Sequence, residues 1–385
     1  VNGQLEGPFG SRDYLETSNK DDPGCPSTPP LIGACNYQAD VLTQRAVEQI
    51  DASAPARPFY LQVDYSAPHG DTVPPIGPEP ATRHFDSAAD TPLPKSPAFN
   101  EGDVSDKPSF IRNDAEYLDP VQIRRIRIEY QKGLESLRSV DEGVAAMFEA
   151  LERNGELDNT YVIFISDNGF FFGEHRLERS KFLPYEPAIR MPLLIRGPGL
   201  EPGSSSGELV ANIDLAPTIL RLARASATRR YDGRPLQRFW ADTSLRTRRP
   251  ILLESFINAT DIDGDGVPDL RRGGAGASIA APVENYLGVR LGPYKYIEYE
   301  TGDRELYDLS KDPYELRSRH KSRRYDRVQR FLSFQIRRLE GCIGGECKFT
   351  TGSIPTPGLP PGQPISPPPG QPISPPPGQP NSPRR

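Results

Sequence analysis

The sequence predicts an α/β fold in which a mostly parallel central sheet is flanked by helices. Residues 161–165 and 191–195 are short, nearly continuous apolar runs, a pattern typical of strands that are buried on both faces. An earlier strand is predicted at 58–63. Between 58–63 and 161–165 lies a helical pattern at 127–153. This strand–helix–strand order predicts a right-handed crossover between parallel strands.

The spacing of apolar residues predicts three helices in the first two thirds of the chain. Residues 39–50 have an amphipathic pattern, and residues 127–153 form a longer one. Asp214 is the predicted N-cap of a third helix, with Pro217 in the first turn, where its missing N–H does no harm. The apolar stripe of the long helix contains Leu134, Leu137, Val144, Met147, Phe148 and Leu151.

The C-terminal part of the chain predicts a smaller subdomain. A strand begins at 251–253, the alternating, aromatic-rich residues 285–300 are typical of a β-hairpin, and 305–309 is a further strand. Residues 325–339 fit a closing helix.

Polar residues follow the strand at 161–165 directly. Asp167 and Asn168 offer hard oxygen atoms at the carboxyl end of a buried strand, where α/β sheets bind ligands, and such atoms suit Ca²⁺ or Mg²⁺. The same residues followed by glycine also suit a plain turn. Further along, Glu174, His175 and Lys181 could converge on an anion. His69 occupies a similar position after the strand at 58–63.

The longer string carries a family resemblance. SDNGFFFGEH at 166–175, then Lys181, then YEPAIRMPLLIRGPG at 185–199 resembles the type I sulfatases of the alkaline-phosphatase superfamily, nearest to N-acetylglucosamine-6-sulfatase-like and arylsulfatase proteins. The resemblance covers most of the chain to about Cys347. It implies an alkaline-phosphatase-like sandwich with a small C-terminal antiparallel sheet and a helix packed on it. The other matching segments are 59–71, 133–164, 210–220 and 295–316.

The resemblance also implies roles for individual residues. Asp167 and Asn168 match the family's late pair of Ca²⁺ ligands, and Lys181 matches the lysine that contacts the sulfate and leaving-group oxygens. His69 matches the histidine near the leaving group, a candidate general acid. His175 lies in the same loop as the metal pair, which leaves a substrate contact and a surface-loop role equally open. The long excursion at 72–119 borders the substrate pocket in this family.

The family's nucleophile has no counterpart in the sequence. That nucleophile is a formylglycine made from the motif Cys-x-Pro/Ala-x-Arg, and the residues around Cys25 do not fit the motif, so Cys25 is interpreted as structural. We therefore expect a C-terminal portion of a sulfatase, inactive by itself, whose formylglycine belongs to a preceding segment. The expected reaction is hydrolysis of a sulfate ester of a sugar, such as N-acetylglucosamine 6-sulfate, or of an aryl sulfate.

Two other functions remain open at this point. A phospho- or phosphonate-ester hydrolase of the same superfamily would share the metal geometry. A non-catalytic calcium-binding surface protein with a proline-rich stalk would use a second acidic loop. That loop has the spacing of a calcium turn, with a plain acidic loop as the alternative, and it contains Asp261, Asp263, Asp265 and Asp269.

Cysteine pairing and the tail favour an exported protein. Cys25 with Cys35 and Cys342 with Cys347 are predicted disulfides, the alternative being free thiols in a cytosolic enzyme. We expect a secreted, periplasmic or cell-surface location. No apolar run is long enough to span a bilayer. The formal net charge of −6 gives no reason to propose nucleic acid as a partner.

The sequence is divided into three regions. Residues 1–245 are predicted to be the C-terminal part of a catalytic domain, and residues 246–348 the smaller α+β subdomain. In 349–385 the motif PGQPISPP recurs and apolar residues are sparse, which predicts a disordered, polyproline-prone tail.

Overall fold

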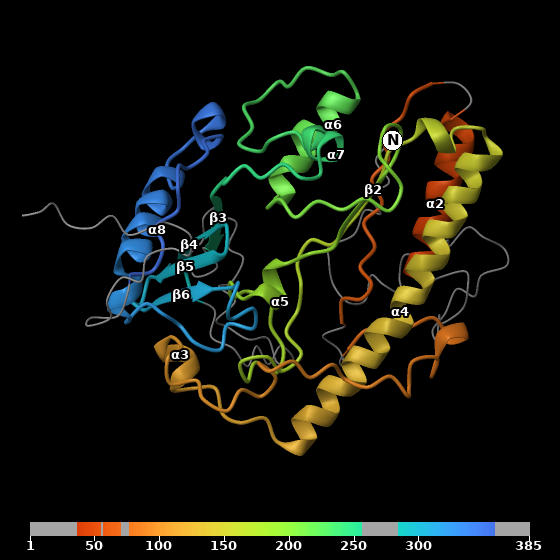
Figure 1. The fold of residues 1–385 in the computed structure, drawn as a ribbon. Helices are drawn as coiled ribbons and strands as arrows, with labels where there is room; N and C mark the ends of the chain where they lie inside the picture. Colours follow the sequence, from red (N-terminus) through yellow and green to blue (C-terminus); the bar gives the residue numbers. More distant parts are fainter. Residues whose placement is uncertain (1–36, 55–56, 71–76, 256–283, 359–385) are drawn as a thin grey trace, which may run out of the picture.

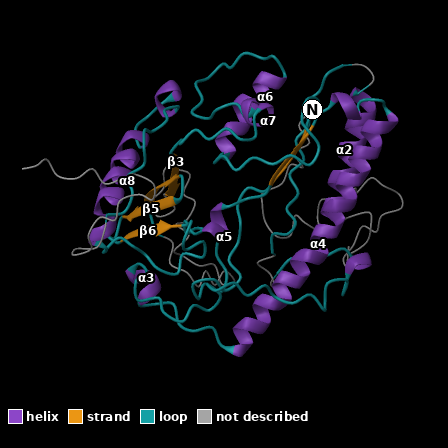
Figure 2. Ribbon diagram, viewed as in Figure 1, coloured by secondary structure: helices purple, strands orange, loops and turns teal. Residues whose placement is uncertain are grey.

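Two antiparallel sheets and two long helices dominate the part of the chain that the computed structural model describes, namely residues 37–54, 57–70, 77–255 and 284–358 (Figure 1). Long loops connect these elements (Figure 2). The helices are α2 (Gln38–Ser53), α3 (Ser109–Arg112), α4 (Pro120–Arg153), α5 (Glu186–Ile189), α6 (Leu215–Leu222), α7 (Gln237–Ala241) and α8 (Asp326–Leu339). The strands are β1 (Val162–Ile165), β2 (Leu193–Arg196), β3 (Ile251–Ser255), β4 (Tyr286–Leu291), β5 (Tyr294–Tyr299) and β6 (Arg304–Asp308).

Helix α4 begins at Pro120, before the predicted start at residue 127. A capping box at Asp119 stabilises this earlier helix start. The Asp119 carboxylate accepts hydrogen bonds from the backbone N–H groups of Val121 and Gln122, at 2.7 and 2.8 Å. The Gln122 side chain accepts one from the Asp119 N–H at 2.9 Å, and Pro120 takes the first helical position. The predicted helix at 39–50 is confirmed as α2, which packs along α4 (Figure 1).

The expected parallel pairing between 58–63 and the strand at 161–165 is not formed. β1 instead pairs antiparallel with β2, with Phe164 opposite Leu194. The chain reverses its direction between β1 and β2. Because of this reversal the two strands pair antiparallel, and no crossover helix is needed to connect them. Residues 58–63 run extended without strand pairing, and Phe59 and Leu61 pack on the apolar cluster between α2 and α4. Both sheets of the described residues are therefore antiparallel.

The C-terminal subdomain is confirmed as a small antiparallel sheet with a helix on it. The strand order is β3-β4-β5-β6, and β4 and β5 form the predicted hairpin. Helix α8 covers one face of this sheet (Figure 1), with Leu332 and Ile336 packed on Val289 and Leu306. All four of these side chains are completely buried.

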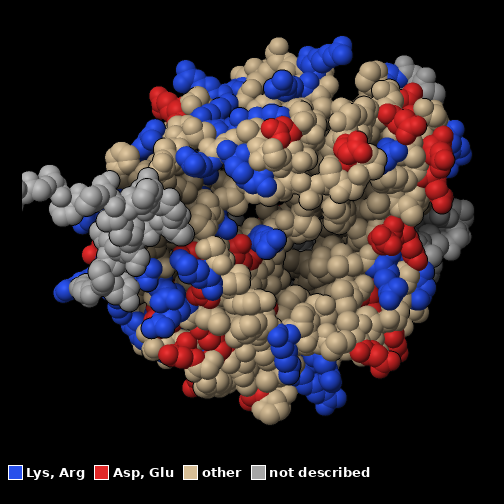
Figure 3. Space-filling model, viewed as in Figure 1, with Lys and Arg blue, Asp and Glu red and all other residues tan. Residues whose placement is uncertain are grey.

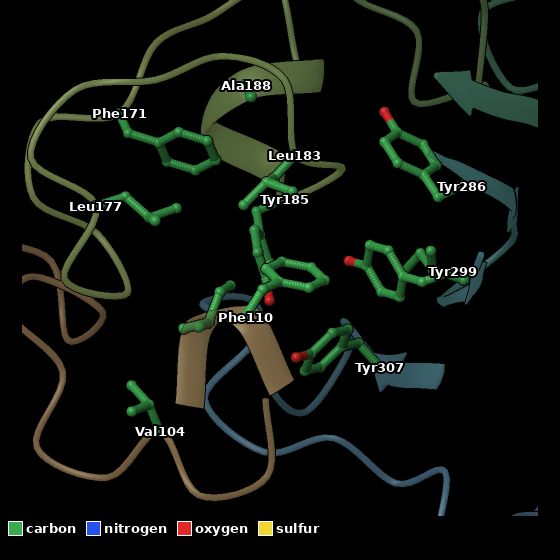
Figure 4. Close-up of a cluster of buried hydrophobic side chains, with 12 residues drawn as sticks. Val104, Phe110, Phe171, Leu177, Leu183, Tyr185, Ala188, Tyr286, Tyr299 and Tyr307 are labelled. Carbon is green, nitrogen blue, oxygen red and sulfur yellow. The ribbon is translucent and has the colours of Figure 1, made fainter. Parts of the chain in front are cut away.

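The other face of the sheet packs on the segment that follows β1. Figure 4 shows the hydroxyl groups of Tyr299 and Tyr307 pointing towards Tyr185, within an apolar cluster that includes Phe171. All three hydroxyls donate to the carboxylate of Glu305, Tyr185 at 2.8 Å and Tyr299 at 2.6 Å. Burial raises the pKa of Glu305, and the tyrosine hydrogen bonds oppose that shift. The sheet and the segment after β1 therefore share one polar centre.

A buried lysine forms a second connection between the same two parts. The Lys295 ammonium on β5 is completely buried and pairs with the carboxylates of Glu315 and Glu186, the latter at 3.2 Å. Because Glu186 begins α5, this ion pair fixes α5 against the sheet. Burying an ammonium without such partners would be strongly unfavourable.

The structure refines two further expectations. Asp214 takes the predicted N-cap position of α6, but its side chain makes no capping hydrogen bond, because its buried carboxylate pairs with the Arg249 guanidinium at 2.7 Å. The tail, expected from Phe349 onward, stays packed through Gly358, whose N–H donates to the Arg324 carbonyl at 2.8 Å. Its apolar anchors are Phe349 and Ile354, which contact the α8 cluster.

The predicted disulfide between Cys342 and Cys347 is present, with a Cα–Cα distance of 5.2 Å. Cys25, Cys35 and the predicted tail beyond Gly358 lie outside the described residues. None of the helices in the described residues is both long enough and apolar enough to cross a bilayer.

Replacing Glu305 with glutamine should destabilise the protein, because an amide has one acceptor oxygen for three tyrosine hydroxyls. We expect Glu305→Gln to lower the free energy of unfolding by about 1–3 kcal/mol. Denaturant unfolding measures the change. Glu340→Gln, at an exposed position, is the control and should stay within about 0.5 kcal/mol of the wild type. Equal stability of the two variants would contradict this role of Glu305.

Candidate functional site

The segment that follows β1 is a loop pinned by backbone hydrogen bonds. The N–H groups of Gly169 and Phe171 donate to the carbonyls of Ala188 and Ser180, at 2.8 and 2.9 Å. A Cβ atom at Gly169 would lie 2.0 Å from the carbonyl oxygen of Pro187, so only glycine fits this approach. The loop thereby returns the residues near 180 to the end of β1.

Asp167 and Asn168 lie at the carboxyl end of β1, as predicted. The Asn168 amide donates to the Asp167 carboxylate, and the Ser166 hydroxyl donates to the Asn168 carbonyl at 2.8 Å. A carboxylate beside an amide oxygen is a donor set of the chemistry that Ca²⁺ prefers. Nowhere in the described ranges do three His, Cys, Asp or Glu residues gather closely enough to hold a metal. These two residues would therefore supply only part of the six to eight oxygens that Ca²⁺ takes.

His69 lies in an exposed turn beside the stretch that contains Lys181. The His69 N–H donates to the Ser66 carbonyl at 2.7 Å, and the ring Nδ1 donates to the Gly70 carbonyl at 2.8 Å. A Cβ atom at Gly70 would lie 3.5 Å from the Arg179 guanidinium, which places this turn against residue 179. With Nδ1 occupied, Nε2 is the ring nitrogen that remains for proton transfer.

Lys181 is half-buried, and its ammonium forms no ion pair with any described residue. Its neighbour Arg179 differs, because its guanidinium pairs with the Glu129 carboxylate at 2.5 Å. The structure thus brings the His69 turn and the Lys181 stretch together, while no direct hydrogen bond joins His69, Lys181 and Asp167 in the described part of the chain. The face in Figure 3 is hollowed near its centre, near the place of α5 in this view.

His175 is an interior residue, which corrects the expected substrate or surface contact. Its side chain is buried, its Nδ1 lies 2.6 Å from the Glu101 carboxylate, and its ring lies 4.3 Å from that of Tyr185. Burial lowers the pKa of His175 to about 3, and the nearby Lys107 ammonium acts in the same direction. The ring is therefore neutral at physiological pH, and its Nε2 has no hydrogen-bond partner in the described structure.

Sequence reasoning missed the residues that hold this loop. Glu101 is buried beside Lys107, whose ammonium lies 3.2 Å from the Glu101 carboxylate. The Arg176 guanidinium donates to the Glu101 carbonyl at 2.8 Å and lies 3.9 Å from the centre of the Tyr117 ring. Together they clamp a loop in which His175 and Arg176 adopt left-handed φ angles of 51° and 64°. The proline-rich excursion at 72–119 contains Glu101, Lys107 and Tyr117, but no spacing pattern indicates these partners.

The remaining sequence predictions fall elsewhere. Asp261, Asp263, Asp265 and Asp269 lie outside the described residues, so the second calcium loop stays a prediction. Lys and Arg side chains gather along the upper edge of the face in Figure 3, over α6 and α7.

Glu101 and His175 affect the pH dependence of stability in opposite directions. Burial raises the pKa of Glu101 from 4.5 to about 7, so folding binds a proton there and stability falls as pH rises through this range. The pKa of His175 falls from 6.5 to about 3, so the unfolded state binds the extra proton and stability rises with pH through that range. Between pH 4.5 and 6.5 the two contributions cancel.

The variant Glu101→Gln should remove this cancellation. The His175 contribution then remains alone, so the variant's stability should rise relative to the wild type by up to about 1.4 kcal/mol per pH unit between pH 4.5 and 6.5. Urea unfolding of the wild type and of the variant at both ends of this pH window gives the slope of stability against pH for each protein. Other titrating groups contribute equally to both slopes, so they drop out of the difference. Glu116→Gln, at an exposed position, should keep the wild-type slope. Parallel profiles for wild type and Glu101→Gln would show that the two pKa shifts do not oppose each other.

Comparison with known proteins places the chain in a family. The sulfatase family model matches residues 7–225. An arylsulfatase of Volvox carteri is 33% identical over 322 residues, which are 73% of this chain and 47% of that protein. The N-acetylglucosamine-6-sulfatase of Bos taurus is 29% identical over 327 residues, 81% of this chain and 57% of that protein. The chain thus spans about half the length of the curated relatives it matches.

Solved structures confirm the alkaline-phosphatase-like fold that the resemblance implies, whereas the strands paired in the described residues are antiparallel and not mostly parallel as predicted. A protein solved in complex with its substrate D-glucosamine-2-N,6-O-disulfate aligns with a TM-score of 0.64 and 21% identity, covering 79% of this chain and 69% of that one. A phosphonate monoester hydrolase from Silicibacter pomeroyi aligns with a TM-score of 0.61 and 20% identity, covering 88% and 67%. These neighbours have the alkaline-phosphatase-like fold. With its family model matched over more than half of its residues, the chain belongs to the sulfatase family.

Proposed function

We propose that the protein hydrolyses sulfate esters. The observation that carries this proposal is the presence of three features in the family-matched part of the chain, of which the His69 turn and the stretch around residue 179 lie close together. These are the Asp167–Asn168 pair at the end of β1, the half-buried Lys181, which forms no ion pair within the described ranges, and the exposed His69 turn packed against residue 179. A cation, hard oxygen donors and a proton donor are the groups that sulfate transfer requires.

Each residue has a distinct role in the proposed reaction. The Lys181 ammonium binds the sulfate and stabilises the negative charge that grows on the leaving oxygen. The protonated ring of His69 donates its Nε2 proton to that oxygen. Asp167 and Asn168 supply part of the ligands of a Ca²⁺ ion, which would neutralise charge on the sulfate oxygens. We further propose that a formylglycine in the complete protein supplies the nucleophile.

The proposed substrate is a sulfated sugar, such as N-acetylglucosamine 6-sulfate, or an aryl sulfate. The matching relatives include an arylsulfatase and an N-acetylglucosamine-6-sulfatase, and one structural neighbour was solved with a disulfated glucosamine. The proposed location is outside the cytoplasm. The Cys342–Cys347 disulfide and a relative from Caenorhabditis elegans described as a putative extracellular sulfatase support this location.

Sulfate release by the product of the complete gene tests the function. In the presence of Ca²⁺, we expect turnover of N-acetylglucosamine 6-sulfate or of an aryl sulfate. Lys181→Ala should lower kcat by about 10²–10³-fold, because it removes a group that stabilises charge in the transition state. Lys321→Ala, an exposed lysine of the C-terminal subdomain, should leave kcat unchanged. Faster turnover of an aryl phosphate or a phosphonate monoester than of any sulfate would favour the alternative hydrolase.

Removal of the Asp167 carboxylate should weaken calcium binding. An amide oxygen carries no net charge, so we expect Asp167→Asn to weaken Ca²⁺ binding by at least about tenfold, a loss of roughly 1.4 kcal/mol. Isothermal titration of the chelator-treated complete protein with CaCl₂ measures the change. Asp158→Asn, an exposed carboxylate outside the loop, is the control. Indistinguishable titrations of Asp167→Asn and the wild type would contradict the assignment.

A further inference from the structure

The outward face of α8 is built from arginines. The buried face of this helix, which includes Val328, Leu332 and Ile336, packs on the C-terminal sheet. Residues spaced by three, four and seven positions share one side of a helix, and here that side is opposite the buried one. The α8 arginine face consists of Arg323 in the preceding turn and of the exposed residues Arg327, Arg330, Phe334, Arg337 and Arg338, and the exposed Asp326 lies at the start of the same side.

The charges of this face are largely unneutralised. Arg337 pairs with Glu298 at 2.9 Å, and the Arg338 guanidinium lies 3.6 Å from the centre of the Phe349 ring. Arg323, Arg327 and Arg330 form no ion pair with any residue of the described ranges. Like charges three and four positions apart on a helix repel, and cations at a helix N-terminus oppose the helix dipole. An external anion would therefore relieve an arrangement that is unfavourable by itself.

The α8 arginine face is separate from the candidate functional site. The sheet β3–β6 carries α8 on one face and contacts the segment after β1 through its other face. Figure 1 shows α8 on the far side of this sheet from α5. The chain as a whole has a formal net charge of −6, so the overall composition does not explain this local excess of arginine.

We propose that the α8 arginine face binds a linear sulfated polysaccharide. Planar guanidinium groups form paired hydrogen bonds with anionic oxygens, and a row of them along a helix matches anions that repeat along a chain. Phe334 is 59% exposed among the arginines and offers an apolar surface to a sugar ring. The choice of a sulfated rather than a phosphorylated polymer rests on the proposed function. Binding at this face would raise the local concentration of sulfate esters near the site.

Binding of a size-defined, fluorescently labelled heparin oligosaccharide to the full chain tests this proposal without any need for turnover. The variant Arg327→Gln/Arg330→Gln should weaken binding by at least about tenfold at low salt. It should also reduce the dependence of binding on salt concentration, because fewer counterions are released. The control is Arg124→Gln/Arg127→Gln on α4, two exposed arginines with the same spacing and no ion pair within the described residues. It should stay within about twofold of the wild type.

Three results would overturn the proposal. If the α8 and α4 variants weaken heparin binding equally, the attraction to positive charge is unspecific. If the α8 variant binds heparin as tightly as the wild type, the polymer binds elsewhere. Tighter binding of single-stranded DNA than of heparin with the same number of charges would assign the face to nucleic acid. Because the substituted arginines are exposed and their removal relieves like-charge repulsion, we expect neither variant to unfold at a lower temperature than the wild type.

The same variants separate this proposal from the proposed function. Arg327→Gln/Arg330→Gln should release sulfate from a monosaccharide ester at the wild-type rate, since the small substrate does not reach α8. Loss of heparin binding with intact sulfate release supports the α8 arginine face. Heparin binding without any sulfate release by the complete protein would refute the proposed function alone.

Discussion

The Glu305 carboxylate holds the C-terminal sheet against the segment that follows β1. It is completely buried, and its hydrogen-bond donors are hydroxyl groups from both sides of one interface. Tyr185 belongs to the segment after β1, whereas Tyr299 and Tyr307 belong to the C-terminal sheet. A carboxylate in this position tolerates little displacement, because each lost hydroxyl leaves a buried acceptor unsatisfied. The C-terminal sheet therefore supports the segment that carries the candidate site, although the sheet contributes none of the proposed catalytic groups.

The loop between β1 and β2 depends on a second buried group of polar residues. His175 and Arg176 adopt left-handed backbone angles. Residues other than glycine rarely adopt such angles unless surrounding contacts stabilise them. Glu101 supplies that support through its side chain to His175 and through its carbonyl to Arg176. The excursion at 72–119 thus helps to hold the loop that leads to Lys181. The family resemblance implies a second role for this excursion, namely bordering the substrate pocket.

Local patterns predicted the local structure well, while the pairing of distant segments was beyond them. The hairpin, the closing helix and the disulfide are encoded within short stretches, so periodicity and spacing were sufficient to find them. The parallel pairing was wrong because two apolar strands carry no information about which neighbour each will meet. The position of Asp167 and Asn168 at the end of β1 was predicted correctly, since they follow their strand directly, while their role as metal ligands stays a prediction. His175 was misplaced because its burial depends on Glu101, far away in the sequence.

The extended residues 58–63 impose a condition on register. Phe59 and Leu61 face the helices, while Tyr60, Gln62 and Asp64 point outward and are linked by side-chain hydrogen bonds of 2.9 and 3.0 Å. Any strand that lies beside this segment must match that two-residue period, because a slip by one position would turn Gln62 towards the helices and Phe59 towards solvent. The alternation therefore admits only shifts by an even number of residues, which halves the ways in which a neighbouring strand can be accommodated.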